Sequence, residues 1–327
     1  AGKWVTPDLS IDSSAMSTPA GTQFSRSGRT AIYLSLVLAV ALVVGVLVGA
    51  KLFFENVARQ PVAMSDLPAP LADSAECANL VDSLPDEVAG HDRSEIAEPA
   101  PAGVAAWASN SLERVTLRCG VDLPLQYTAY AEPQEIEGVQ WLRVTDVTPE
   151  STLATWYSVD RTPVVAVTAD EPSLGGADNP VAELGESVST LAVADHEPNP
   201  APLSQLAAGD TSVCDDLMAN LPDTIAEEHQ RIEVSEPFTA AWTAPGREPI
   251  VLRCGVAPPE NYEPGLQLTQ VDEIPWFEDT TLANGTTTST WFALGRATDI
   301  AVSVPQDAGS AAIVELGEAI TEHTPEQ

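Results

Sequence analysis

The longest apolar run of the chain lies near its N-terminus. Residues 30–50 read TAIYLSLVLAVALVVGVLVGA and carry no charged side chain. As an α-helix these 21 residues would span about 31 Å at 1.5 Å per residue, close to the roughly 30 Å hydrocarbon thickness of a bilayer. The pattern predicts a transmembrane helix over 30–50. Residues 1–29 are polar and lack apolar periodicity, so we expect them to form a disordered cytoplasmic tail.

Length and flanking charge decide how this segment is interpreted. A cleaved signal peptide has a shorter apolar region than this one, so the length favours a retained anchor, although the small residues at its end resemble a cleavage site. Arg26 and Arg29 precede the segment, whereas Lys51 follows it and the next basic residue is Arg59. This small excess of positive charge favours an N-terminus inside the cell and a C-terminal part outside the membrane.

Small residues form a stripe within the apolar segment. Ala41, Gly45 and Gly49 recur at every fourth position, which places them on one face of a helix where a second helix could approach closely. Such stripes also arise by chance in segments rich in glycine and alanine. Helix–helix packing through these residues is therefore one hypothesis.

Beyond the apolar segment the sequence repeats itself. Leu-Arg-Cys-Gly-Val at 117–121 returns at 252–256, 135 positions later. Cys-x6-Leu-Pro-Asp at 77–86 returns at 214–223, and further matched aromatic and arginine positions follow the same displacement or a slightly larger one. Copies of this length are too long for a solenoid repeat, so the pattern indicates a tandem domain duplication.

Each copy has the same order of hydrophobic patterns. Apolar residues at helical spacing come first and end at Leu-Pro-Asp, because proline interrupts the helical hydrogen bonding. Strict alternation then predicts strands, most clearly at 114–119 and 250–254, and helical spacing returns at 181–191 and 313–320. The predicted fold class is α+β, with a helix, about four mostly antiparallel strands and a closing helix in each copy, both helices packing on one face of the sheet.

Composition suggests where these parts begin and end. Segments rich in proline, alanine and polar residues lie before and between the copies and are expected to be linkers. The predicted organisation is a tail at 1–29, a transmembrane helix at 30–50, a linker at 51–74, the first copy at 75–192, a linker at 193–210, the second copy at 211–322 and a tail at 323–327.

The four cysteines lie at matched places, two in each copy. The duplication therefore predicts the disulfides Cys77–Cys119 and Cys214–Cys254, each joining the first helix to the sheet. A loop of about 40 residues gives on the order of 4 kcal/mol in the chain-entropy model. Zinc ligands would need closer spacing, so no metal site is expected. Paired disulfides are typical of an oxidising compartment and support the orientation inferred from the charges.

Charge and motifs restrict the functions that are plausible. The formal net charge is −34, and the acidic excess lies beyond residue 50. Such a field disfavours nucleic acid as a partner, although it also serves simply to keep a protein soluble. No GxSxG, HExxH, EF-hand or phosphate-binding glycine motif occurs, so we expect neither an enzyme nor a cofactor.

Six arginines occupy matched positions in the two copies: Arg93, Arg118, Arg161, Arg231, Arg253 and Arg296. One interpretation is that each pairs with a nearby carboxylate and holds the fold. The other is an anion or partner site on the sheet face opposite the cysteines, where Arg118 and Arg253 should point. The matched tryptophans are expected in the core, and His91 and His229 at the surface or as caps.

The motifs of each copy resemble an actinobacterial family known as domain of unknown function 3515, over about 75–192 and again 211–322. Members of that family look like membrane-anchored or exported proteins and usually carry one copy; the resemblance implies no catalytic residues. The leading hypothesis is a non-enzymatic, membrane-anchored extracytoplasmic binding or accessory protein of an actinobacterial cell envelope, with a membrane or cell-envelope protein as partner. The alternatives are an accessory subunit of a larger membrane complex, such as a respiratory supercomplex or envelope-biogenesis assembly, and an envelope enzyme with an unrecognised site.

Overall fold

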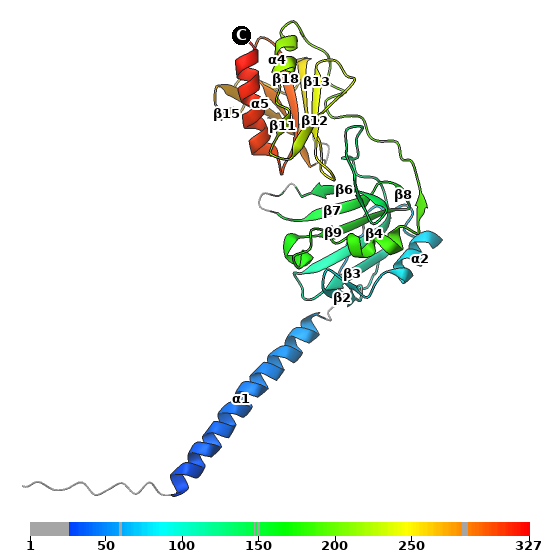
Figure 1. Ribbon diagram of the computed structural model, residues 1–327, viewed down its shortest axis with the longest axis vertical. Coiled ribbons are helices and arrows are strands. Elements are labelled where there is room, and N and C mark those ends of the chain that lie inside the picture. The colour runs from blue at the N-terminus through cyan, green and yellow to red at the C-terminus, as the bar shows by residue number, and fades with distance from the viewer. Residues whose placement is uncertain (1–25, 59–60, 147, 149–150, 283–286) are drawn as a thin grey trace, which may run out of the picture. The chain divides into compact units, whose positions relative to one another are not determined.

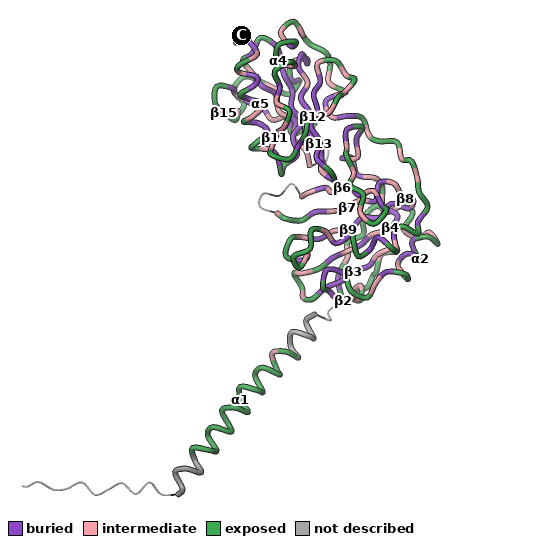
Figure 2. The backbone as a smooth tube through the Cα atoms, viewed as in Figure 1, coloured by how far each residue is buried: buried purple, intermediate pink, exposed green. Residues whose placement is uncertain are grey.

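The computed structural model describes residues 26–58, 61–146, 148, 151–282 and 287–327, and most of the expected cytoplasmic tail lies outside them. The chain divides into two units, residues 1–55 and 56–327. In the first, α1 (Arg26–Ala58) is a single long helix (Figure 1). Its segment Ile32–Lys51 is long and apolar enough to cross a membrane, and none of it is buried (Figure 2).

The second unit contains two antiparallel sheets of eight strands with the same strand order. In the first copy the order is β1-β2-β3-β4-β9-β7-β6-β5. The strands are β1 (Glu87–Val88), β2 (His91–Ser94), β3 (Val104–Ala108), β4 (Arg114–Val121), β5 (Gln134–Ile136), β6 (Val139–Thr145), β7 (Ala154–Ser158) and β9 (Val164–Ala169). A separate two-stranded ribbon pairs β8 (Arg161–Thr162) with β10 (Ala192–Val193).

The second copy repeats this topology in the order β11-β12-β13-β14-β18-β17-β16-β15. Its strands are β11 (Thr224–Ile225), β12 (His229–Ile232), β13 (Thr239–Thr243), β14 (Ile250–Val256), β15 (Thr269–Val271), β16 (Ile274–Asp279), β17 (Thr288–Ala293) and β18 (Asp299–Pro305). The α+β class and the antiparallel pairing predicted from sequence are confirmed. Each sheet has more strands than expected, because strands of two to four residues are too short to show an alternating pattern.

Helices cover one face of each sheet, as predicted. In the first copy α2 (Ala75–Ser83) is capped by the Ser74 hydroxyl, and its buried Cys77 and Leu80 share a core with Trp107 and Leu117. In the second copy α4 (Cys214–Asn220) and α5 (Gly309–His323) contact each other over the corresponding core. Figure 1 shows α4 and α5 against the strands of that copy.

The closing helix differs between the copies. The second copy has the expected continuous helix, α5, whose buried residues include Ile313, Leu316 and Ile320. In the first copy the helix expected over 181–191 is shortened to the 3-10 turn Ala182–Leu184 and the short α3 (Gly185–Val188), and a separate 3-10 turn, Glu171–Leu174, precedes it. Pro180 and the glycine pair before it explain this difference, since proline and glycine are the poorest helix formers.

The segment before each first helix covers the opposite face of its sheet. We call residues 61–74 the first strap and residues 193–210 the second strap. In the first, Val62 and Met64 pack on Ala106 and Ala108 of β3, which alternate with the core residues Ala105 and Trp107.

The second strap likewise packs against the second copy. Its buried residues Ala201 and Leu203 share a cluster with Ala241 on β13 and Val251 on β14. At its beginning it contacts the first copy, where Asn199 N donates to Tyr127 O at 2.8 Å. Composition alone led us to expect linkers here; in the structure the two straps are layers of the domains.

Candidate functional site

The two predicted disulfides are present. Cys77 on α2 is bonded to Cys119 on β4, and Cys214 on α4 to Cys254 on β14. All four residues are buried, and no cysteine is free. Each bond therefore ties the first helix to a central strand of its copy, as the sequence indicated.

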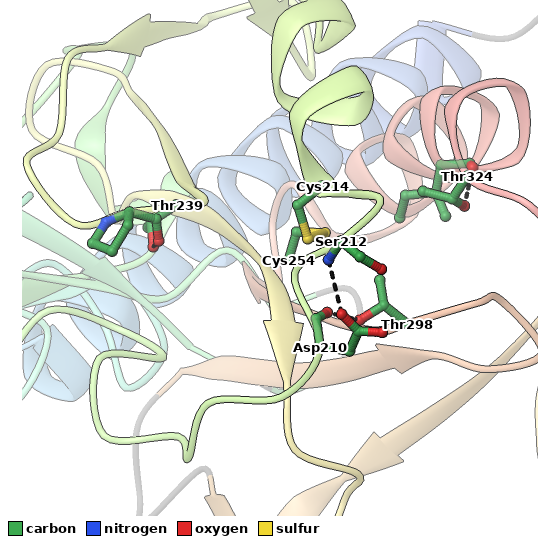
Figure 3. The surroundings of a disulfide bond; sticks show 9 residues. Asp210, Ser212, Cys214, Thr239, Cys254, Thr298 and Thr324 are labelled. Atoms are coloured by element: carbon green, nitrogen blue, oxygen red, sulfur yellow. Dashed lines mark hydrogen bonds between the residues drawn. A yellow bond between two sulfur atoms is a disulfide. The ribbon is translucent and has the colours of Figure 1, made fainter.

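The end of the second strap lies beside its disulfide (Figure 3). The Ser212 amide donates to the Asp210 carboxylate at 2.9 Å, and this hydrogen bond lowers the pKa of Asp210. The Thr298 hydroxyl donates to the Asp210 backbone carbonyl. Polar groups near the disulfide therefore anchor the strap to the second copy.

The glycine of the Leu-Arg-Cys-Gly-Val motif lets the strap come close. Gly120 and Gly255 have φ values of +86° and +74°, and the sheet register shifts at both positions. A Cβ on Gly120 would lie 2.3 Å from the Leu71 carbonyl carbon, and one on Gly255 2.9 Å from the Asp210 carbonyl oxygen. Each glycine thus forms a bulge on which the backbone of the strap rests.

The arginine of the same motif holds the strap in place. Arg118 donates to the Ser65 carbonyl at 2.7 Å, and Arg253 donates to the Leu203 and Leu206 carbonyls, both at 2.8 Å. Burial lowers the pKa of Arg118. As expected, both side chains lie on the face opposite the cysteines, where they donate hydrogen bonds to backbone carbonyls.

A second pair of matched arginines terminates the first helices. Arg93 donates to the Val81 carbonyl at 3.3 Å and lies over the Trp107 ring at 5.0 Å from its centroid. Arg231 donates to the Met218 and Leu221 carbonyls at 2.9 and 3.2 Å. Because the last carbonyls of a helix lack partners within it, these arginines complete its hydrogen bonding.

The third pair stabilises loop and helix ends. Arg161 forms an ion pair with Asp160 at 2.6 Å and donates to the Gly138 carbonyl at 2.5 Å. Arg296 is buried and donates to the carbonyls of Thr321 and Thr324 at the end of α5. The contacts of all six matched arginines favour the fold-holding interpretation, with carbonyls more often than carboxylates as partners. Their role in binding an anion or a partner stays a prediction.

Most matched tryptophans and both matched histidines are buried, and Trp291 is partly buried. Trp107 and Trp242 are fully buried, and their indole N–H groups donate to Pro85 and Pro222 of the Leu-Pro-Asp turns. The expectation that His91 and His229 lie at the surface is wrong, since they are 5% and 1% exposed. Both histidines follow a turn and enter the interior from β2 and β12, where their ring nitrogens contact backbone carbonyls.

Hydrogen bonds between polar groups join the first copy to the second. The Arg143 amide donates to the Gly246 carbonyl at 2.8 Å, and the Gly246 amide donates to the Glu132 carbonyl at 2.6 Å. The Thr243 hydroxyl reaches the Glu132 carboxylate at 2.6 Å. These bonds place a turn of the second copy along the edge of β6.

A further contact joins Tyr130 of the first copy to Glu236 of the second, with 2.5 Å between the phenolic oxygen and the carboxylate. Burial and this carboxylate raise the pKa of Tyr130, so the phenol remains a hydrogen-bond donor over the whole neutral range. Tyr130 also belongs to the apolar cluster that covers the second sheet.

A cleft of about 390 Å³ lies beside these contacts and is lined by Arg143, Trp156 and Arg247. The Arg143 guanidinium carbon lies 5.7 Å from the centre of the Trp156 ring, and its Nε is buried without a hydrogen-bond partner in the described part of the chain. Burial first, and the charge of Arg247 second, lower the pKa of Arg143.

Acidic groups balance the second arginine of the cleft. Arg247 forms ion pairs with Glu228 at 2.9 Å and with Asp307 at 3.6 Å. The cleft therefore offers charges of both signs and an aromatic ring, which suits a polar protein segment better than a simple anion. Among the described residues no cluster of histidine, cysteine and carboxylate side chains could hold a metal ion.

Sequence reasoning missed Arg143 and Arg247 because it looked for residues that recur in both copies. At the displacement of 135 their counterparts are Glu278 and Leu112. Positions that meet across the contact between the copies cannot be equivalent, because each copy uses a different surface there. Arginines without a counterpart in the other copy were the signal that could have identified these two residues.

Taken together, these features define a protein with an apolar helix suited to a membrane and two tandem, disulfide-bonded α+β domains, a combination typical of membrane-anchored or exported proteins. A family model described as "Protein of unknown function (DUF3515)" matches residues 36–196 and 191–327. The chain belongs to this family and carries two copies of its domain. Each match includes the strap of its copy. Neither the curated proteins nor the solved structures give a match.

Proposed function

We propose that this chain is a non-enzymatic, membrane-anchored binding or accessory protein of the cell envelope that engages a membrane or cell-envelope protein. The observation that carries the proposal is the contrast between matched and unmatched residues. The matched arginines, tryptophans and glycines hold each copy together, whereas the cleft beside the matched Trp156 is also lined by Arg143 and Arg247, which have no arginine counterpart in the other copy. A binding surface of that kind needs no catalytic group.

In this proposal α1 is a retained single-pass anchor with its N-terminus inside the cell. The disulfides and the basic residues Arg26 and Arg29 support this orientation. A reporter that is active only outside the membrane should be active when fused after Gln327 and inactive when fused before Thr30. The opposite pattern, or a mature protein that begins near Lys51 and is released from membranes, would refute the anchor.

Co-purification of the full chain from native membranes, followed by mass spectrometry, tests the partner. Arg143→Gln changes the cleft, and because Arg143 Nε has no hydrogen-bond partner among the described residues, we expect the fold to survive. Arg114→Gln is the matched control, since Arg114 is exposed and lies outside the cleft. We expect a stoichiometric partner that is lost from R143Q and retained by R114Q; absence of any partner from the wild-type chain contradicts the proposal.

The second candidate function is a subunit of a larger membrane complex held through the helix. A Cβ added to Gly45 or Gly49 would meet no atom of the described residues within 4 Å, so the small-residue face is open there to a neighbour. Gly45→Leu should then remove the partner while R143Q keeps it. If R143Q alone removes the partner, the contact lies outside the membrane.

A further inference from the structure

A second cavity, of about 340 Å³, lies between the second strap and the sheet of the second copy. Its walls are mostly apolar, formed by strap residues such as Leu203 and Leu206 and by Leu125 of the first copy, and they also include the polar side chains of Gln126, Thr290 and Ser303. Leu125 and Leu282 line it and remain 49% and 38% exposed, so apolar surface continues to the mouth. We call this cavity the Glu248 pocket.

One carboxyl group lies among these apolar walls. Glu248 lines the pocket and is only 4% exposed. The Thr288 hydroxyl donates to it at 2.6 Å and the Thr287 hydroxyl donates to its other oxygen. Gln126 of the first copy, which also lines the pocket, donates to the Thr287 oxygen at 3.0 Å. A chain of hydrogen bonds across the two copies thus fixes the carboxyl group.

No basic side chain balances Glu248 in the described part of the chain. The adjacent Arg247 forms its ion pairs with Glu228 and Asp307, and His229 contacts only the backbone carbonyl of Glu248, at 3.1 Å. Burial raises the pKa of Glu248 to about 7, the Thr287 and Thr288 hydroxyls oppose that rise, and Asp307 adds to it. A buried carboxylate without a cation is costly, and a cation brought by a ligand would offset that cost.

We propose that the Glu248 pocket binds a molecule with an apolar body and a single primary ammonium group, which takes the Glu248 carboxylate as its counter-ion. Charge complementarity selects this class: an anion would face the Glu248 carboxylate, and a neutral apolar ligand would leave that carboxylate without a counter-ion. The apolar body fills the space between the strap leucines. This inference is independent of the proposed protein partner, whose cleft has different walls.

The ligand should bind the ionised form of Glu248. Because the pKa of Glu248 is raised to about 7, the ionised fraction of its carboxyl group falls about tenfold from pH 8 to pH 6. An alkylammonium group stays protonated over that range. Affinity for an amine should therefore fall about tenfold between these pH values. Arg143, Arg247 and Asp307 line a small cavity with Glu248, and burial lowers the pKa of the neighbouring His229.

The test uses the full chain in lipid nanodiscs, with empty nanodiscs as the blank, and measures hexylamine binding by saturation-transfer NMR. Hexanol and hexanoate, which share the apolar body, are the comparison probes. Glu248→Gln keeps the shape of the side chain, and Glu113→Gln is the control because Glu113 occupies the corresponding position of the first copy. Leu125→Ala trims the exposed mouth without disturbing the core.

We expect hexylamine to bind the wild-type chain and E113Q equally, at least tenfold more tightly than hexanol or hexanoate. E248Q should lose at least tenfold in affinity together with the pH dependence, and L125A should lose several-fold. Equal binding of hexylamine and hexanol, or unchanged affinity in E248Q, overturns the proposal. If E248Q fails to fold, the proposal is overturned when L125A binds hexylamine with unchanged affinity and the wild-type chain shows no pH dependence of that affinity.

Discussion

Gly120 is the point at which the first strap rests on the sheet, and Gly120→Ala tests whether that contact stabilises the domain. The residue has φ +86°, and a left-handed conformation costs a non-glycine residue about 1–2 kcal/mol. The added Cβ would also lie 2.3 Å from the carbonyl carbon of Leu71 and 2.4 Å from the amide nitrogen of Ala72. Because both are backbone atoms, the strap itself must move.

That movement has a further cost. The Leu71 amide donates to the Gly120 carbonyl at 3.1 Å, and a displaced strap would lose this bond, which is worth about 1 kcal/mol. We therefore expect Gly120→Ala to lower the free energy of unfolding by about 2–4 kcal/mol. Gly138→Ala is the control, because Gly138 has φ +75° but no atom within 4 Å of its added Cβ; it should lose only about 1–2 kcal/mol.

Urea unfolding of the full chain in nanodiscs, followed by tryptophan fluorescence, gives the two free energies. Amide hydrogen exchange then locates the change: residues 61–74 should exchange faster in G120A and at the wild-type rate in G138A. Equal losses of stability in the two variants, with no faster exchange in the strap, would show that the strap is not held by the bulge and that the reasoning from the close approach is incorrect.

Three other predictions follow from single groups. Burial raises the pKa of Glu248 from 4.5 to about 7 in the folded chain, so the folded state binds more protons than the unfolded state between these pH values. The free energy of unfolding should therefore fall by about 3 kcal/mol as the pH rises from 4.5 to above 7. In Glu248→Gln the urea midpoints at pH 4.5 and pH 8 should converge. Arg296→Met should cost about 1–3 kcal/mol and speed amide exchange at the end of α5; unchanged exchange there would exclude the capping role. Replacing both Cys214 and Cys254 by alanine should lower the unfolding free energy by about 2–5 kcal/mol, measured by the same urea titration.

Patterns of side chains in the sequence predicted the parts of the fold that depend on side chains. Alternation in the Leu-Arg-Cys-Gly-Val strands placed Cys119 and Cys254 in the core and Arg118 and Arg253 on the opposite face, and both placements are confirmed. The duplication fixed the disulfide pairing. Helical spacing located α2, α4 and α5, because each buries one face against a sheet.

Backbone interactions were harder to predict. The straps are held by carbonyls that accept from Arg118 and Arg253 and by backbone pairing beside Gly120 and Gly255, and such contacts leave no periodic side-chain pattern. Their proline-rich composition therefore resembled that of linkers. The apolar spacing at 181–191 predicted a full closing helix in the first copy, whereas Pro180 and the glycines before it shorten that helix.

Duplication gives this chain a pocket that one copy alone cannot form, because residues of both copies line it. Glu113 and Glu248 occupy the same position in the two copies, yet Glu113 is half-buried with Asn110 as its partner, whereas Glu248 is covered by the strap and by the loop of Gln126. The two positions hold the same residue type but differ in burial, because residues of the first copy form one wall of the pocket around Glu248. Functional residues in a tandem protein are thus to be sought where the copies meet, since equivalence between copies is explained by the fold they share.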